Sequence, residues 1–172
     1  MSLLNDGLAA LGPWITAYGA LAVFIIIYLE SFGMPLPGES CVVAASLLAA
    51  HNQLSIVLVI LAVLSGAMLG DSTGYLIGKF GGQRVLQRIG PWVKLTPERL
   101  ASFEERFQRQ GFWMVAFARF VIVLRQINGI MAGSLAMPWH VFVSANVIGA
   151  VLWTAVYTLG PYWFTELFHK LL

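Results

Sequence analysis

The stretch Glu30-Ser-Phe-Gly-Met-Pro-Leu-Pro-Gly-Glu39 interrupts apolar sequence and decides how the first half of the chain folds. Its prolines and glycines cannot continue a helix, because proline lacks a backbone N–H and its ring clashes with the preceding turn. Apolar residues fill 14–29 before the stretch and resume directly after it. We therefore expect a first apolar helix, a sharp break, and a returning half-helix over 40–50, followed by a span from 54.

The apolar segments are too long and too free of charge for a soluble protein. Of the 172 residues, 59% are apolar and 10% are charged, whereas a typical soluble domain has about 25% charged residues. Residues 7–29, 40–70 and 126–165 contain no Asp, Glu, Lys or Arg, and a spanning helix needs only about 20 residues. One straight helix over 40–70 is excluded, because it would measure about 46 Å against a hydrocarbon core of about 30 Å. The composition excludes a cytosolic enzyme and indicates an integral membrane protein.

The second half repeats this plan. Phe112–Leu124 is apolar, Asn128-Gly129 supplies a break, 130–137 returns, and Val141–Gly160 is long enough to span. Two broken apolar segments, each followed by an intact one, are typical of inverted-repeat transporters.

The expected fold is an all-α integral membrane protein. Two re-entrant helical hairpins, each followed by a transmembrane helix, form a pseudo-symmetric inverted repeat with amphipathic cytoplasmic helices between the halves. The whole chain, 1–172, is expected to be one membrane domain. Its first half covers 14–78 with the broken segment 30–50, its connector 79–111, and its second half 112–165 with the broken segment 112–137. The junctions at 35–38 and 125–129 are expected at membrane depth.

The connector carries most of the charge. Ten of the eighteen charged residues lie between Lys79 and Arg109, and seven of these are basic. Because short loops rich in Lys and Arg stay on the cytoplasmic side, we place 79–109 in the cytoplasm. Two short amphipathic helices are expected, separated by Gly90-Pro91, with the second capped by Thr96-Pro97 and ended by Gly111. A helix lying on an anionic membrane surface and a solvated connector both fit this pattern.

Five charged residues stand within apolar sequence and sum to −1. Placing each at the bilayer centre costs at least about 2.5–3.5 kcal/mol. They either form structural ion pairs that hold the hairpins together, or line a cavity where acids take up protons and arginines hold an anion. These residues are Glu30, Glu39, Asp71, Arg119 and Arg125.

The helix break and the two arginines favour an anionic ligand. At Pro37-Gly38-Glu39-Ser40 a half-helix begins within the membrane, and its free N–H groups attract a negative group such as a phosphate. Arginine binds phosphate with a planar pair of donors. Arg119 and Arg125 are about 120° apart on an ideal helix, so they reach one cavity only if the backbone bends or the side chains converge.

Other residue types point to packing. The glycines over 66–78 indicate close helix contacts, and the single cysteine, Cys41, excludes an intramolecular disulfide. Trp153 fits an interfacial or packing role. No histidine has a second ligand at metal spacing, and no nucleophile or nucleotide-binding motif is present. We expect no enzymatic activity, no cofactor, no metal and no nucleic-acid partner.

At these residues the chain resembles the DedA family of bacterial inner-membrane proteins, which shares the SNARE-associated or VTT domain. The resemblance covers 30–153. One departure is Ile122, where the family usually has proline. The matching stretches are Glu30-x-x-Gly33-x-Pro-x-Pro-Gly-Glu39, Gly70-Asp71-x-x-Gly74-Tyr75-x-x-Gly78, Arg119-Phe120…Arg125 and Ala132-Gly133…Met137…Phe142…Asn146-x-x-Gly149-Ala150…Trp153.

The resemblance implies a multi-pass inner-membrane lipid transporter. Its substrate would be undecaprenyl phosphate or phosphatidylethanolamine, with protons as the coupling partner. Glu39 and Asp71 match the proton-coupling acids, and Arg119 and Arg125 match the essential arginines, here expected to bind the headgroup. The supporting positions are Glu30, Gly33, Pro35, Pro37, Gly38, Ser40, Gly70, Gly74, Tyr75, Gly78 and Asn146.

Two other functions remain open from the sequence. A proton or small-cation antiporter would use the same acids, although it has little need for paired arginines. A non-transporting scaffold would need the charges only for folding. A monomer and a homo-oligomer are both compatible with the sequence.

Overall fold

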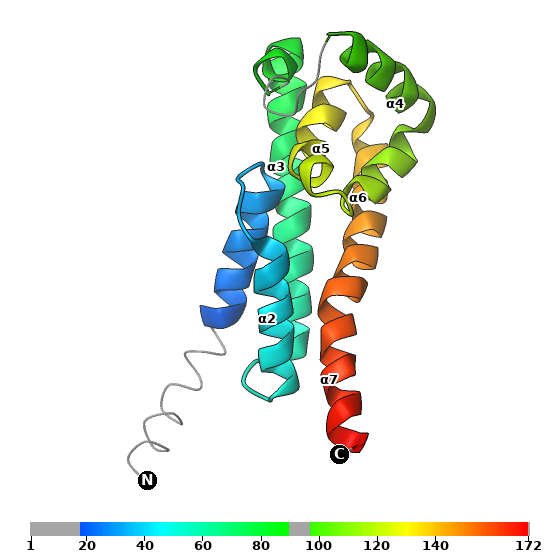
Figure 1. Cartoon of the computed structure of the whole chain (residues 1–172). Helices are drawn as coiled ribbons and strands as arrows, with labels where there is room; N and C mark the ends of the chain where they lie inside the picture. Colours follow the sequence, from blue (N-terminus) through cyan, green and yellow to red (C-terminus); the bar gives the residue numbers. More distant parts are fainter. Residues whose placement is uncertain (1–17, 90–96, 172) are drawn as a thin grey trace.

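The computed structural model describes residues 18–89 and 97–171 (Figure 1). Its first helix, Tyr18–Ser31, is followed by an irregular segment over 32–37, after which α2 (Gly38–Ala50) runs back beside it. Gly33 has φ +113 in this segment, a conformation that glycine adopts at little cost because it lacks a Cβ. The predicted break and the returning half-helix are confirmed.

α3 (Ile56–Ile89) is a single helix of 34 residues, about 51 Å long at 1.5 Å per residue. Its part Ile56–Gly81 is long and apolar enough to cross a membrane. The first of the two expected connector helices is therefore not a separate element, because its residues are the last turns of α3. Glycines at 81 and 82 weaken a helix without ending it. The expected break at Gly90-Pro91 and the Thr96 cap lie outside the described residues.

α4 (Pro97–Ala118) begins at Pro97, as predicted, but does not end at Gly111. The backbone is non-helical at Gln110 (φ −132, ψ 18), and the helix resumes directly after it. Gly111 packs against the Phe107 ring, and apolar residues continue the helix. The expected end is thus a kink, and the connector helix leads straight into the second hairpin.

The second hairpin breaks at Arg119-Phe-Val121, between α4 and α5 (Ile122–Ser134). The sequence placed this break at 125–129, which is wrong, because Asn128-Gly129 lies in the middle of α5. The Asn128 amide donates to the Val115 carbonyl at 3.1 Å, which ties the two arms of the hairpin together. The Asn-Gly pair therefore serves packing between helices instead of a turn.

Glycines set the spacing of the helices around α3. On α3, glycines repeat every four residues. Gly66 and Gly70 lie against the backbone of the first helix at Phe24 and Tyr28, and Gly74 and Gly78 lie against α5 at Ile130. On the facing side of α5, Gly129 and Gly133 lie so close to α3 that a Cβ at either position would collide with a backbone oxygen of α3. Small residues allow such close approach in membranes, as the sequence predicts. The series on α3 is Gly66, Gly70, Gly74 and Gly78.

The last three elements form one long rod. α6 (Trp139–Thr154) passes without a break into the π-helix η2 (Ala155–Leu159) and α7 (Gly160–Leu171). Over Trp139–Thr165 this rod is long and apolar enough to cross a membrane.

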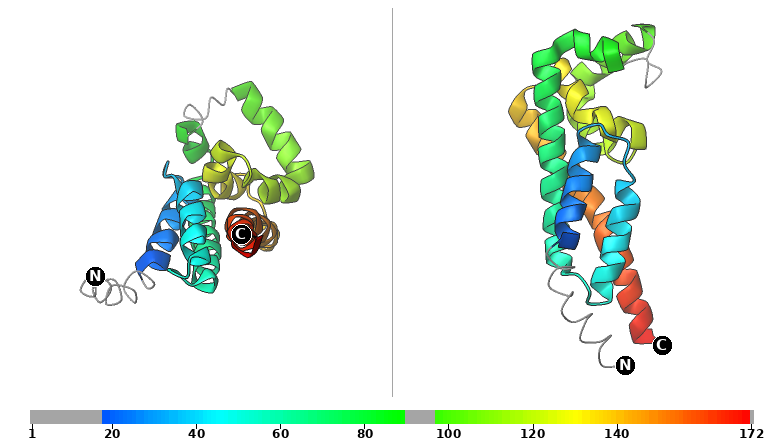
Figure 2. Two further views of the ribbon diagram at one scale, coloured as in Figure 1. Left: turned by 60° about the horizontal axis from the view of Figure 1, so that its bottom comes forward. Right: turned by 90° about the vertical axis from the view of Figure 1, so that its left-hand side faces the viewer.

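The two hairpins approach from opposite ends of the molecule (Figure 2). α2 joins the lower end of α3 through a turn over 51–55, and α5 joins the upper end of α6 through a turn over 135–138 (Figure 1). α2 and α5 each have 13 residues. As a result, the tips of the hairpins point toward each other in the middle of the molecule.

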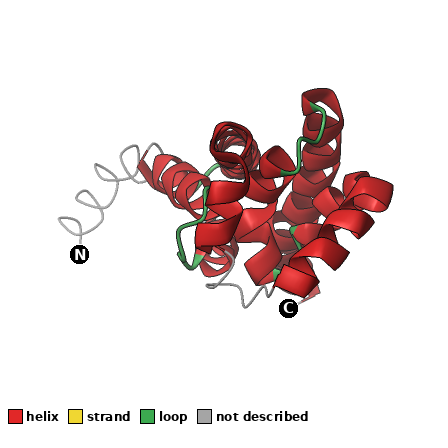
Figure 3. Ribbon diagram, turned by 90° about the horizontal axis from the view of Figure 1, so that it is seen from above, coloured by secondary structure: helices red, strands yellow, loops and turns green. Residues whose placement is uncertain are grey.

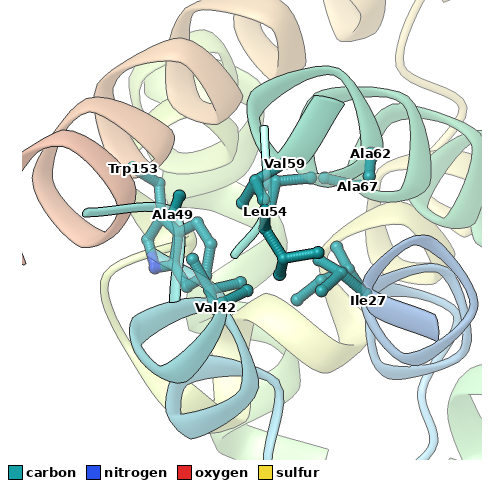
Figure 4. Packing of buried hydrophobic residues seen from close by; sticks show 11 residues of the cluster. Ile27, Val42, Ala49, Leu54, Val59, Ala62, Ala67 and Trp153 are labelled. Atoms are coloured by element: carbon teal, nitrogen blue, oxygen red, sulfur yellow. The ribbon is translucent and has the colours of Figure 1, made fainter. Parts of the chain in front are cut away.

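Two apolar cores lie above and below this level. The lower core joins the first helix, α2 and α3, and Figure 4 shows Trp153 of α6 lying beside Val42 and Ala49 of α2. The upper core gathers around Tyr75 and Phe142. The described residues contain no strand (Figure 3), so the all-α class is confirmed there.

Replacing Gly129 with alanine tests the close contact between α5 and α3. Its Cβ would collide with the Asp71 carbonyl oxygen, so the backbones must separate, at a cost of about 1–3 kcal/mol as in overpacked cores. We expect a lower unfolding temperature in detergent. Gly19→Ala is the matched control, because its Cβ would meet only the end of the flexible Leu54 side chain and alanine favours a helix. Equal unfolding temperatures for the two variants would contradict this contact.

Candidate functional site

Asp71 and Arg119 form a buried ion pair between α3 and the tip of the second hairpin. The Arg119 Nη2 atom donates to Asp71 Oδ2 and, at 2.6 Å, to Asn146 Oδ1 of α6. Both charged side chains are at most 2% exposed. Three elements far apart in the sequence thus meet at one guanidinium group.

Arg125 forms a second buried cluster with two glutamates. Its Nη2 lies 2.5 Å from Glu30 Oε1, and its Nη1 lies 3.2 Å from Glu39 Oε1. Its guanidinium carbon also lies 5.1 Å from the centre of the Trp153 ring, a cation–π arrangement. One arginine therefore links α5 to α6 and to both arms of the first hairpin.

The break before α5 brings the two arginines to one level. Arg119 lies in the turn, and Arg125 lies in the first turns of α5. On an unbroken helix they would point about 120° apart. The bend that the sequence analysis required is therefore present, although at 119–121 and not at the predicted 125–129.

The expected anion site at the start of α2 is filled by the chain's own Glu30. The Glu30 carboxylate lies against Gly38, the first residue of α2, where a Cβ would collide with it. An anion is favoured there because the first N–H groups of a helix lack partners within the helix. Glu30, predicted as a supporting residue, is thus a direct ligand of Arg125 and occupies the position expected for a phosphate.

Glu39 is the accessible member of the cluster. Its side chain is 31% exposed, whereas those of Arg125 and Glu30 are each 4% exposed. Pro35 and Pro37 beside it are exposed at the hairpin tip. Glu39 is therefore the acid of the cluster that is most open to its surroundings.

The remaining predicted residues divide into packing residues and one outlier. Tyr75 donates to the Met137 carbonyl at 2.5 Å and stacks on Phe142, which anchors α3 to the turn before α6. Gly70, Gly74 and Gly78 serve the helix contacts described above. Ser40 is exposed on α2, and the structure gives it no contact in the cluster.

The sequence analysis missed the direct role of Trp153. The predicted packing role is confirmed, because Trp153 belongs to the lower core, but its ring also lies under the Arg125 guanidinium. The spacing of Asn146, Gly149 and Trp153 along one helix could have indicated a shared face, since residues three, four and seven apart lie together. Among the described residues, no three His, Cys, Asp or Glu side chains are grouped as metal ligands.

The five paired charges, Glu30, Glu39, Asp71, Arg119 and Arg125, form a polar layer between the two apolar cores. On α3, Asp71 falls between Ala67 of the lower core and Tyr75 of the upper core. Asp71 is 15 residues after Ile56 and 10 before Gly81, or about 22 and 15 Å along the helix. The layer is therefore well inside the apolar part of α3.

The Asp71–Arg119 pair can be tested by removing one partner and then both. Arg119→Leu leaves Asp71 buried without a counter-charge, which costs about 3–5 kcal/mol for a buried pair. Asp71→Leu together with Arg119→Leu should recover much of that loss, as measured by thermal unfolding in detergent. Arg109→Leu is the control, because its pair with Glu105 is exposed and should not change the unfolding temperature. A double variant less stable than Arg119→Leu would contradict the pairing.

Comparisons with known proteins show which family this chain belongs to. The VTT domain family model matches residues 36–161. An uncharacterized membrane protein of Synechocystis sp. is 40% identical over 139 residues, which cover 81% of this chain and 64% of that protein. One from Mycobacterium tuberculosis is 37% identical over 77% of this chain and 63% of its own length. The membrane protein YbfM of Bacillus subtilis is 29% identical over 85% of this chain and 91% of its own length.

The chain spans less than two thirds of the first two relatives. No solved structure matches it. The family model covers most of the chain and includes Glu39, Asp71 and both buried arginines. The chain therefore belongs to the VTT domain family of membrane proteins, the DedA family.

Proposed function

We propose that this protein moves lipids with a phosphate-containing headgroup across a bilayer, and that proton uptake by a buried acid frees an arginine to bind the headgroup. The observation that carries this proposal is the Glu30 carboxylate, held by Arg125 at the start of α2. A phosphate has the same negative oxygens and suits the same donors. The chain's own acid thus marks an anion site that a headgroup can take over.

Charge balance supports a proton in this exchange. Asp71 and Arg119 neutralise each other, whereas Arg125 is shared by Glu30 and Glu39, which leaves one negative charge in excess. An uncompensated charge in an apolar layer is costly, and one proton on either glutamate removes it. A protonated glutamate also binds the guanidinium less strongly, so Arg125 becomes available.

The fold supports a proposed arrangement in the membrane. The two hairpins are re-entrant halves of an inverted repeat, whose tips meet at the polar layer, while α3 and the α6–α7 rod span the bilayer. The basic segment 79–109 lies in the cytoplasm. The named relatives are membrane proteins of bacteria, which supports a multi-pass location in the bacterial inner membrane.

The proposed substrates are undecaprenyl phosphate and phosphatidylethanolamine. Both carry the phosphate that the arginine cluster suits, one as an anionic and one as a zwitterionic lipid. The proposal needs no chemical step, no cofactor and no nucleic acid. It holds for a monomer as well as for a homo-oligomer.

Purified protein in vesicles that contain a headgroup-labelled phospholipid tests the proposal against its alternatives. Lipid movement that depends on the protein supports transport of lipids. Movement of protons or small cations without lipid movement favours an antiporter, and neither movement favours a scaffold; both results would overturn the proposal.

Variants of Arg125 test the role of its two-pronged donors. Arg125→Ala should slow lipid movement at least roughly 30-fold, because losing one partner of a buried charge pair costs about 2 kcal/mol or more. Arg125→Lys should restore only part of the rate, since an ammonium group lacks the planar fork. Arg109→Ala, at an exposed pair, is the control. A fully active Arg125→Lys protein would show that lipid movement needs only a positive charge at this position, and not the planar pair of donors.

Variants that imitate a protonated acid test the coupling. Glu39→Gln should bind headgroups but lose the response of lipid movement to an imposed pH gradient, because its charge no longer changes. Asp71→Asn tests the other predicted acid in the same assay. A gradient response that survives both substitutions would refute the coupling role and leave these acids as structural partners of the arginines.

A further inference from the structure

A second group of buried polar atoms continues from Arg125 along the α6–η2 segment. Among the described residues, Trp153 Nε1, Thr154 Oγ1 and Thr158 Oγ1 have no hydrogen-bond partner, although these residues are at most 4% exposed. The Nε atom of Arg125 is buried and unpartnered as well. Native proteins rarely leave such groups unsatisfied unless water fills the space. We call Trp153, Thr154 and Thr158 the polar strip.

The two threonines differ from several other helical hydroxyls among the described residues. Ser46, Ser72 and Thr165 each donate to the carbonyl four residues earlier, at 2.6–3.0 Å. Such a bond satisfies a hydroxyl within its own helix. Thr154 and Thr158 make no such bond, so their hydroxyls remain free to bind something else.

The helix is also irregular at the polar strip. Thr158 lies in the π-helix η2, which begins directly after Thr154. Single π-turns inside α-helices are frequently found at functional sites. η2 packs against α2, the helix whose first turn holds Glu39. The strip is therefore enclosed between two helices that both reach the acid cluster.

The strip offers polar groups that can bind a row of water molecules. The Arg125 guanidinium lies over the Trp153 ring at 5.1 Å, and Thr154 is the next residue of the helix, on a neighbouring face. Thr158 follows four residues later across η2, about one turn further along the helix. One water that accepts and donates at normal distances spans about 5.6 Å between two hydroxyls. Polar atoms spaced in this way can bind consecutive waters.

We infer that the polar strip holds a file of buried water that carries protons between the Glu30–Glu39–Arg125 cluster and the end of the molecule opposite the connector. This inference rests on the proposed function, because it supplies the route by which its acid is protonated. Along the file, each water releases one proton as it accepts another. The proton that arrives binds a glutamate carboxylate, whose charge changes from −1 to 0, and no other reactant is needed.

The titratable groups around the strip are arranged so that the acids that can take up a proton lie at the Arg125 end. α2 contributes Glu39 and the partly buried Cys41, and η2 and α7 contribute the partly buried Tyr157 and Tyr162. Arg125 on α5 and Glu30 on the first helix complete the upper end. The carboxylates, which accept protons most readily among these groups, are therefore all at the upper end.

Hydration of the strip is testable without any transport. In nanodiscs, the Trp153 indole N–H, assigned by its loss in Trp153→Phe, should show magnetisation exchange with water. Thr158→Val should lower the unfolding temperature and Thr158→Ser should keep it, because only the valine variant removes the hydroxyl to which the buried water is hydrogen-bonded. No water signal, together with a raised unfolding temperature in Thr158→Val, would mean a dry strip and would overturn the inference.

Proton flux tests the role of that water. With a pH-sensitive dye inside vesicles, the Thr154→Val/Thr158→Val protein should show at least tenfold slower proton entry than the wild type. Thr165→Val, which removes a hydroxyl already bonded within its own helix, should stay within twofold. Equal proton entry in the double variant and the wild type would refute the route while leaving the proposed lipid transport standing. A wild type that moves no lipid would instead refute the proposed function.

Discussion

The pairing of two buried arginines with three acids holds the centre of this protein together. These contacts join residues 48, 86 and 95 positions apart in the chain, and they connect both hairpin tips to α3 and α6. An unpaired charge at this depth would be costly, so each hairpin is stable in its place only while the other supplies its partner. The two halves of the fold therefore depend on each other through a few hydrogen bonds.

Under the proposed function, this dependence means that the residues that hold the fold together are also the residues that bind the ligand. The acids that make the arginines tolerable in an apolar layer also occupy the positions where an anionic ligand would bind. A ligand that displaces Glu30 must replace a contact that stabilises the fold, so the protein never has to expose a bare guanidinium group. The mutual pairing that the sequence left open as a structural alternative is present in the structure, where it holds the hairpins together.

The sequence predicted the helical class, the first break and the charged residues of the layer, because prolines and isolated charges act locally and strongly. The prediction from sequence was wrong where one residue pair suits either a turn or close helix packing. Asn128-Gly129 has the composition of a turn, and only the neighbouring backbone of α3 shows that it serves close packing. The true break at 119–121 contains neither glycine nor proline. The direct roles of Glu30 and Trp153 depend on contacts between distant segments, which spacing along one chain does not reveal.

The glycine series of α3 has a mechanical consequence. Toward α5, α3 presents Gly74 and Gly78, and a shift of four residues, about 6 Å along the axis, brings one glycine to the place of the other. These glycines therefore fix how closely α5 packs on α3 but not its axial register. The register of α5 on α3 must come from directional contacts, chiefly Arg119 with Asp71 and Tyr75 with Met137. The Asp71–Arg119 pair thus fixes the axial position of α5 on α3. Neutralising Asp71 would weaken this contact and make it easier for the second hairpin to shift along α3.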